Sequence, residues 1–554
     1  MPVTGDSVEV PSPEGRGWDR RTFLRAGGLT IGGISLGTFL AACGTSTSTG
    51  TNGSGGTGSS GSGSGTLTLR LPFLQDMQVP DPDIMYEGEG LQVMDSCYEG
   101  LVNYKPGTSE IVPGLAKSWT VSDDQLTYTF KLVPGVKFHD GTPADASAWI
   151  KSFDRRLKVN QGPAYMVQGV VKMAAPDATT FVVTLKEPNN AFLHYAACPW
   201  QMFAVSPAAV AKHAKSGDLA QGWLQTHDAG TGPYVMSEFV RGSHYTLQAF
   251  DGYWGPKPTF KTVRIVITPS IATQKLQLDQ GAFDLVTKGF AIPDVLSYKT
   301  NPQFSVTTAF GASVMVMWMN TSAGIFANVA VRKAMMTALD RTAIVNSAFS
   351  GLTTVEKNFW PEDMFPAGLA PFSTDLNTAP LEAAVKNLPS RTVDMAYVTS
   401  YGAPAQQIAE LCQAQLAPLG LNATIRAMPS AEEFDLVNQA PGKRPDLMIA
   451  GIGGDALHLD TAARIFLRTG AKPLNFFAYS NKTIDSLMDL AIQQPTEAKM
   501  NQIYLQMTKL IESEALWVPF CRTPYNLIAQ KYISGLMLNS YIPEIFNPDK
   551  ITRT

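Results

Sequence analysis

Alternating apolar and polar residues mark several strands in the first half of the chain. Over 126–132 every second residue is apolar, which is the period of a strand with one buried face. Turn residues follow, and either Thr142 or Asp145 is placed to cap a helix. Another strand is expected over 179–185, and three more, separated by glycine and proline turns, over 230–267.

Helical periodicity dominates from residue 271 onward. Apolar residues at helical spacing predict one helix over 328–345 that is capped by Asn328. Strands are then expected over 392–398, 421–428 and 445–452, with helices between them. Strands that alternate with helices are typical of a doubly wound α/β sheet.

An uncharged apolar stretch over 26–42 is preceded by Arg20 and Arg21 and ends at Cys43. It is shorter than the about 20 apolar residues that a membrane-spanning helix needs. The residues around the arginine pair resemble a twin-arginine export signal, and the four residues ending at Cys43 resemble a bacterial lipobox. We therefore expect a signal over 1–43 with lipid attached at Cys43; the alternative is a signal anchor.

The next segment, 44–65, contains only Gly, Ser, Thr and one Asn, so it cannot form a core and is expected to be a flexible tether. No later stretch has 18 uncharged apolar residues, which predicts a water-soluble body beyond the tether. The net charge of −4 argues against nucleic acid as a partner. Together these features predict a protein held by lipid at the outer face of the cytoplasmic membrane.

Four further cysteines could form disulfides outside the cytoplasm, but the sequence cannot rank the three possible pairings of Cys97, Cys198, Cys412 and Cys521. Cys412 falls on the apolar face of a predicted helix, so a buried free thiol is at least as good an interpretation there.

Several motifs occur in a fixed order, and they include "KLVPGVKFHDGTPADASAWIKSFDR", "AGTGPYVMSEFVRG", "FDGYWGPKP" and "VRKAMMTALDR". Together they resemble the family-5 extracellular solute-binding proteins of bacterial ABC importers, a group that includes oligopeptide, dipeptide and nickel binders. The resemblance runs from about residue 66 to 540.

The resemblance implies an α/β, periplasmic-binding-protein-like fold of two lobes with mixed sheets, hinged by two crossovers. We place the crossovers near 314–322 and 515–527. Lobe I would comprise 66–315 plus 525–554, with a subdomain inserted at about 100–227, and lobe II would comprise 316–524. The implied partners are a small solute, most simply a peptide, and an ABC permease complex in the cytoplasmic membrane; we expect a monomer without a cofactor.

Asp455 is the best match to the acidic residue that, in peptide-binding relatives, pairs with the peptide amino group. The alternative is that Asp455 caps the next helix, with Asp460 and Arg464 paired at the surface. The other ligand-binding candidates lie in a loop after the first strand, at the first crossover, after the strand over 392–398, and beside Asp455; they are Tyr86, Glu87, Trp318, Asn320, Tyr401 and His458. Ordinary packing is an equally good interpretation of each of these.

Two departures from the family pattern bear on the ligand. First, Asp455 lacks the Trp that precedes the acidic residue in relatives and the Asp-Pro that follows it. Second, the segment 392–425 contains no Lys or Arg that could bind the carboxylate of a dipeptide. A longer peptide or a non-peptide ligand is therefore favoured over a dipeptide held by both ends. Nickel or metal-chelate, opine and oligosaccharide binding remain alternatives. An exported hydrolase fits less well, because the six histidines are scattered without zinc-site spacing.

Overall fold

The computed structural model describes residues 7–9, 67–361, 364, 373–388, 390–539, 541–543 and 545–554. The predicted export signal with Arg20 and Arg21, the predicted lipid site Cys43 and the predicted tether 44–65 lie outside these residues. No helix of the described part is both long enough and apolar enough to cross a bilayer.

A four-stranded sheet contains the strand that follows the predicted tether. Its strand order is β2 (Thr68–Phe73), β11 (Thr262–Ile267), β10 (His244–Ala249) and β9 (Tyr234–Val240). β2 and β11 are parallel, and the other two pairings are antiparallel. The three strands predicted over 230–267 are confirmed here. Helix α2 (Leu91–Cys97) packs in the same core, because Leu91 and Met94 are buried among residues of these strands.

A five-stranded antiparallel sheet occupies much of the region in which we predicted an inserted subdomain. Its order is β1 (Ser7–Glu9), β7 (Val170–Asp177), β8 (Thr180–Leu185), β6 (Thr127–Leu132) and β5 (Ala116–Val121). The predicted strands over 126–132 and 179–185 are confirmed. The side chain of Asp145 accepts a hydrogen bond from the Ala148 amide, so Asp145 rather than Thr142 caps helix α3 (Ala146–Val159).

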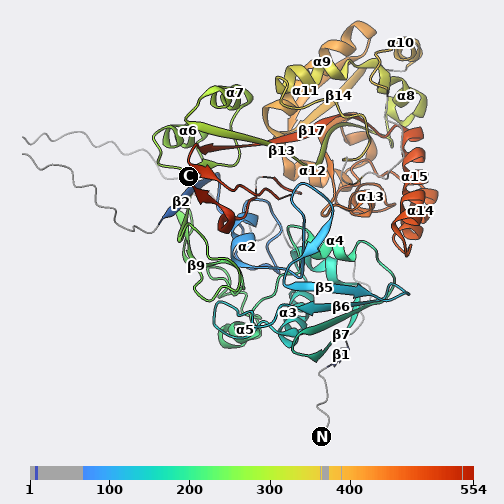
Figure 1. Ribbon diagram of the computed structural model, residues 1–554. Coiled ribbons are helices and arrows are strands. Elements are labelled where there is room, and N and C mark those ends of the chain that lie inside the picture. The colour runs from blue at the N-terminus through green and yellow to red at the C-terminus, as the bar shows by residue number, and fades with distance from the viewer. Residues whose placement is uncertain are drawn as a thin grey trace, which may run out of the picture. The chain divides into compact units, whose positions relative to one another are not determined.

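A six-stranded mixed sheet, called the central sheet below, contains the long strands β13 (Phe304–Met319) and β17 (Trp517–Gln530) (Figure 1). Its order is β12 (Leu285–Val286), β17, β13, β16 (Leu447–Gly453), β14 (Thr392–Val398) and β15 (Asn422–Met428). The long strands β13 and β17 pair along most of their lengths, and β12 and β16 join them at opposite ends. The predicted crossover segments 314–322 and 515–527 lie mainly in these two strands.

Short elements and helices connect and cover the sheets. The small strand pairs are β3 (Val102–Tyr104) with β4 (Ile111–Pro113), and β18 (Ile533–Ser534) with β19 (Thr552–Arg553). The remaining helices of the described part are α4 (Phe192–Ala197), α5 (Pro207–His213), α6 (Ile271–Asp279), α7 (Ile292–Thr300), α8 (Val329–Ala338), α9 (Arg341–Phe349), α10 (Ala379–Val385), α11 (Gly402–Leu416), α12 (Ser430–Asp435), α13 (Leu459–Leu467), α14 (Lys482–Ala491) and α15 (Glu497–Glu514).

The predicted single helix over 328–345 is wrong, because the structure has two helices there. Asn328 caps α8 as predicted, but the backbone of Leu339 is extended, and a second helix begins after Asp340. The Asp340 side chain accepts a hydrogen bond from the Ala343 amide at 2.9 Å and so caps α9. The guanidinium of the buried Arg341 donates to main-chain oxygens, including that of Pro519 at 3.0 Å, which favours the break.

The four cysteines of the described body are all buried free thiols: Cys97, Cys198, Cys412 and Cys521. Cys412 lies on the buried face of α11 together with Ile408 and Leu416. The interpretation of Cys412 as a small core residue is therefore confirmed, and the open question of the disulfide pairing is answered by four unbridged thiols.

Candidate functional site

Three neighbouring parallel strands end at one edge of the central sheet. β14 pairs in parallel with β16 on one side and with β15 on the other. Tyr401 follows β14 in a one-turn helix over Thr399–Tyr401, and Asp455 follows β16. In open α/β sheets, ligands bind beyond the carboxyl ends of the strands, so this edge is the natural place to look for a site.

Asp455 accepts hydrogen bonds from two tyrosines that are far away in the sequence. The Tyr86 and Tyr165 hydroxyls both donate to the Asp455 Oδ2 atom. Tyr86 lies in the loop between β2 and α2, and Tyr165 lies in a short 3-10 helix over Gly162–Val167. Three oxygen atoms therefore converge at one point, and one of them belongs to a carboxyl group.

The interpretation of Asp455 as a helix cap is wrong. His458 caps α13, since its Nδ1 atom accepts a hydrogen bond from the Asp460 amide at 3.3 Å. Asp460 is buried rather than at the surface, and it accepts two hydrogen bonds from the Arg464 guanidinium at 2.8 Å. Asp455 thus directs its carboxyl group toward the tyrosines instead of toward its own helix.

A row of aromatic rings surrounds this carboxyl group. The ring centroids of Tyr86 and Tyr165 are 6.3 Å apart, and those of Tyr86 and Trp200 are 5.2 Å apart. Tyr195 extends the row beyond Tyr165 at 5.8 Å, and Tyr541 extends it beyond Trp200 at 5.9 Å. All five side chains are partly exposed, so they line a surface that solvent reaches.

The phenols beside Asp455 stay protonated. Burial raises the pKa of Tyr165 well above its usual value, and the nearby Asp455 carboxylate raises it further. Burial and the charge of Asp455 also raise the pKa values of Tyr195 and Tyr541. These hydroxyls can therefore donate to a carboxylate or accept from a cation, because a neutral phenol does both.

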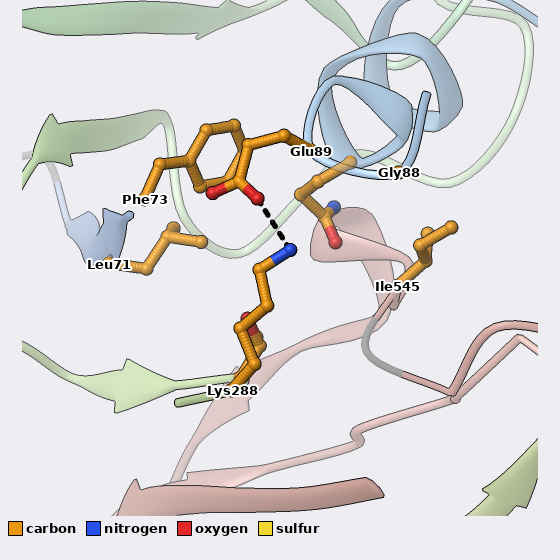
Figure 2. A pocket seen from close by; sticks show the side chains of 8 residues that line it. Leu71, Phe73, Gly88, Glu89, Lys288 and Ile545 are labelled. Atoms are coloured by element: carbon orange, nitrogen blue, oxygen red, sulfur yellow. Dashed lines mark ion pairs between the residues drawn. The ribbon is translucent and has the colours of Figure 1, made fainter. Parts of the chain in front are cut away.

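Glu87 supports its own loop instead of facing Asp455. Its carboxyl group accepts main-chain N–H bonds from Gln78, Glu89 and Gly90, the last at 2.8 Å. The adjacent Glu89 is buried and pairs with Lys288 at 2.5 Å. Figure 2 shows this pair in a small hollow whose cavity volume is about 10 Å³. Because that volume holds about one water molecule, this hollow cannot take a solute.

Trp318 and Asn320 lie within the central core. The Trp318 ring packs against Trp517 and Phe466, with ring centroids 4.9 Å and 5.4 Å away. The Asn320 side chain donates to the main-chain oxygens of Pro441 and Pro445, each at 3.2 Å. These contacts fix the end of β13 and the segment before β16, and the structure does not bring either residue to Asp455.

Tyr401 contacts β16, and His458 follows Asp455 by three residues. Tyr401 packs against β16 so closely that a Cβ atom at Gly451 would lie 2.7 Å from its hydroxyl oxygen. His458 is buried, and its Nε2 atom is 3.2 Å from the Met500 sulfur. Burial lowers the pKa of His458 to about 4, so the imidazole is neutral. No group of three or more His, Cys, Asp or Glu side chains suited to a metal ion occurs in the described part of the chain.

Sequence reasoning found Asp455 and Tyr86 but missed their neighbours Tyr165, Tyr195 and Tyr541. Each of these tyrosines lies in a segment without a distinctive motif, and they come together only because distant parts of the chain meet. No residue pattern in these segments singles out the three positions.

Comparisons with known proteins give a consistent result. Residues 110–473 match the family model of bacterial extracellular solute-binding proteins, family 5 (middle). A probable D,D-dipeptide-binding periplasmic protein of Escherichia coli (strain K12) is 27% identical over 485 residues, which are 86% of this chain and 93% of that protein.

Two solved structures illustrate the likeness in fold. An ABC transporter substrate-binding protein of Listeria monocytogenes has a TM-score of 0.78 at 21% identity, covering 88% of this chain and 99% of that one. An ABC transporter-associated periplasmic binding protein of Helicobacter pylori, in complex with the peptide STSA, has a TM-score of 0.72 at 22% identity, covering 88% and 98%. The predicted mixed α/β, periplasmic-binding-protein fold is thereby confirmed.

Proposed function

Because the chain belongs to the bacterial extracellular solute-binding proteins of family 5, we propose that it delivers a peptide or peptide-like solute to an ABC permease in the cytoplasmic membrane. The solute would be enclosed between the two lobes proposed from the sequence, 66–315 with 525–554 and 316–524. Closure of such lobes is favoured by contacts that form only when both of them touch the ligand.

The observation that carries the proposal is the meeting of three oxygens at Asp455. The Tyr86 and Tyr165 hydroxyls donate to this carboxyl group from segments that belong to the proposed lobe I, whereas Asp455 belongs to the proposed lobe II. A primary ammonium group has three N–H donors. It could replace the two phenol donors at the carboxylate and donate to both phenol oxygens, so the free amino end of a peptide suits the site.

The test is calorimetric titration with tripeptides that carry either a free or an acetylated N-terminus. We expect the free form alone to bind tightly. Replacing Asp455 by Asn should weaken binding at least about 30-fold, since removing one partner of a buried charge pair costs about 2 kcal/mol or more. Asp123→Asn is the matched control, because Asp123 is an exposed acid. Equal affinity of the acetylated and free forms would refute the role of Asp455.

The mode of attachment is a separate proposal. Export would depend on Arg20 and Arg21, and lipid on Cys43 would hold the protein at the outer face of the membrane. Replacing both arginines by lysine should leave the protein in the cytoplasm, and Cys43→Ser should move it from the detergent phase to the aqueous phase of Triton X-114. A Cys43→Ser protein that still partitions with detergent would exclude lipidation at this position.

A further inference from the structure

Glu433 lies at the same edge of the central sheet as Asp455 and Tyr401. Helix α12, which contains Glu433, begins two residues after β15. β14 is the middle one of the three parallel strands, between β16 and β15. Asp455, Tyr401 and Glu433 therefore follow three neighbouring strands at one carboxyl edge of the sheet. Tyr401 follows the middle strand, β14.

Glu433 is a largely buried acid that has no ion pair or side-chain hydrogen bond among the described residues. Its exposed fraction is 5%, and its carboxyl oxygens are not among the fully buried polar atoms of that part of the chain that lack a partner, so solvent reaches them. Burial alone raises its pKa to about 7. The neighbouring Glu432 differs in this respect, because its carboxylate pairs with Arg426 at 2.6 Å. Holding a carboxylate in a largely buried place without a cationic partner costs free energy, so the position of Glu433 calls for an explanation.

The surroundings of Glu433 point toward the site. Burial raises the pKa of Tyr401, and the nearby Glu433 and Tyr525 raise it further. A Cβ atom at Gly311 would lie 2.9 Å from the Tyr525 ring and 2.8 Å from the main-chain oxygen of Tyr541, so Tyr525 is a neighbour of one of the tyrosines around Asp455. Tyr401 and Tyr525 are both partly exposed.

The cations near this end of the site are few, since no Lys or Arg occurs between 392 and 425. Arg426 in β15 pairs with Asp394 at 3.1 Å and with Glu432 at 2.6 Å, so its charge is already neutralised by other acids. An ionised Glu433 would repel a ligand carboxylate, whereas it would attract a cation, and more strongly in a partly desolvated place than in water.

We propose that Glu433 binds a second cationic group, so that the solute is a basic peptide or a peptide-like dication whose amino end lies at Asp455. This inference rests on the function proposed above. The ligand cation supplies the partner that Glu433 lacks among the described residues, which accounts for a largely buried acid at this edge.

The test uses four tripeptide amides built on alanine, with either lysine or norleucine at the second or the third position. Norleucine keeps the length of the lysine side chain but lacks its charge. In titration calorimetry, we expect lysine to bind at least about 10-fold more tightly than norleucine at one of the two positions, which corresponds to about 1.4 kcal/mol. Glu433→Gln should reduce this ratio to below twofold.

Glu187→Gln is the matched control, since Glu187 is exposed, and it should keep the full lysine preference. The ratio of two affinities measured on one variant is insensitive to a general loss of folded protein. A wild-type ratio below twofold at both positions, or a ratio that Glu433→Gln does not change, would overturn the inference alone. Failure of all four peptides to bind the wild-type protein would overturn the proposed function as well.

Discussion

Removing Arg155 should destabilise the loop that presents Tyr86 to Asp455. Arg155 donates to both oxygens of the fully buried Asp81, to Asp83 at 2.5 Å and to the main-chain oxygen of Leu219. These bonds join α3 to the segment between β2 and α2. In the Arg155→Met variant, Asp83 keeps its hydrogen bond from the Arg156 Nε atom at 2.8 Å. Asp81, in contrast, loses Arg155, which is its cationic partner among the described residues.

The size of the effect follows from the pKa of Asp81. Burial raises this pKa even beside Arg155, so the orphaned carboxyl group should take up a proton instead of remaining charged. Protonating a carboxyl group of ordinary pKa costs about 5 kcal/mol at pH 7.5 and about 2 kcal/mol at pH 5.5. We therefore expect the free energy of unfolding to fall by up to these amounts, with the larger loss at the higher pH.

Urea unfolding followed by tryptophan fluorescence would measure the loss, provided that the m value stays unchanged. The double variant Asp81→Asn, Arg155→Met is the control, because it removes both charges and should lose less stability than Arg155→Met at pH 7.5. A loss below about 1 kcal/mol at pH 7.5, the size of an ordinary hydrogen bond, would refute the reasoning. An equal loss at both pH values would refute the explanation through Asp81.

Three further predictions concern stability and the thiols. Burial raises the pKa values of Asp95 and Glu99 to about 7, so these groups stabilise the fold most below their unfolded pKa values, and this contribution is lost as the pH rises through about 7. The thermal midpoint should therefore be lower at pH 8 than at pH 6, and Glu99→Gln should reduce the difference; an unchanged difference would contradict the assignment. Asp340→Ala removes the cap of α9 and should lower the free energy of unfolding by about 1 kcal/mol in urea titration, whereas no change would mean that the cap is not needed. The four buried thiols should react with iodoacetamide only after denaturation, as read by mass spectrometry of each peptide; rapid labelling of the native protein would contradict their burial.

Much of the fold could be predicted because it depends on local periodicity. The alternation over 126–132 and the helical stripe around Cys412 record which face of an element is buried, and both elements occur as predicted. The break between α8 and α9 could not be predicted in this way. It depends on Arg341 reaching the main-chain oxygen of Pro519, 178 residues away.

By itself, the sequence determined strands such as β6 and β8, helices such as α3 and α11, and the position of an acid shortly after a parallel strand, because residues within a few positions of one another set these features. Only the tertiary structure decided what surrounds that acid. Tyr165 reaches Asp455 across 290 residues of chain, and Glu433 comes to the same edge through strand order alone. Such neighbours leave no periodic trace, since side chains far apart in sequence are brought together by the packing of whole elements.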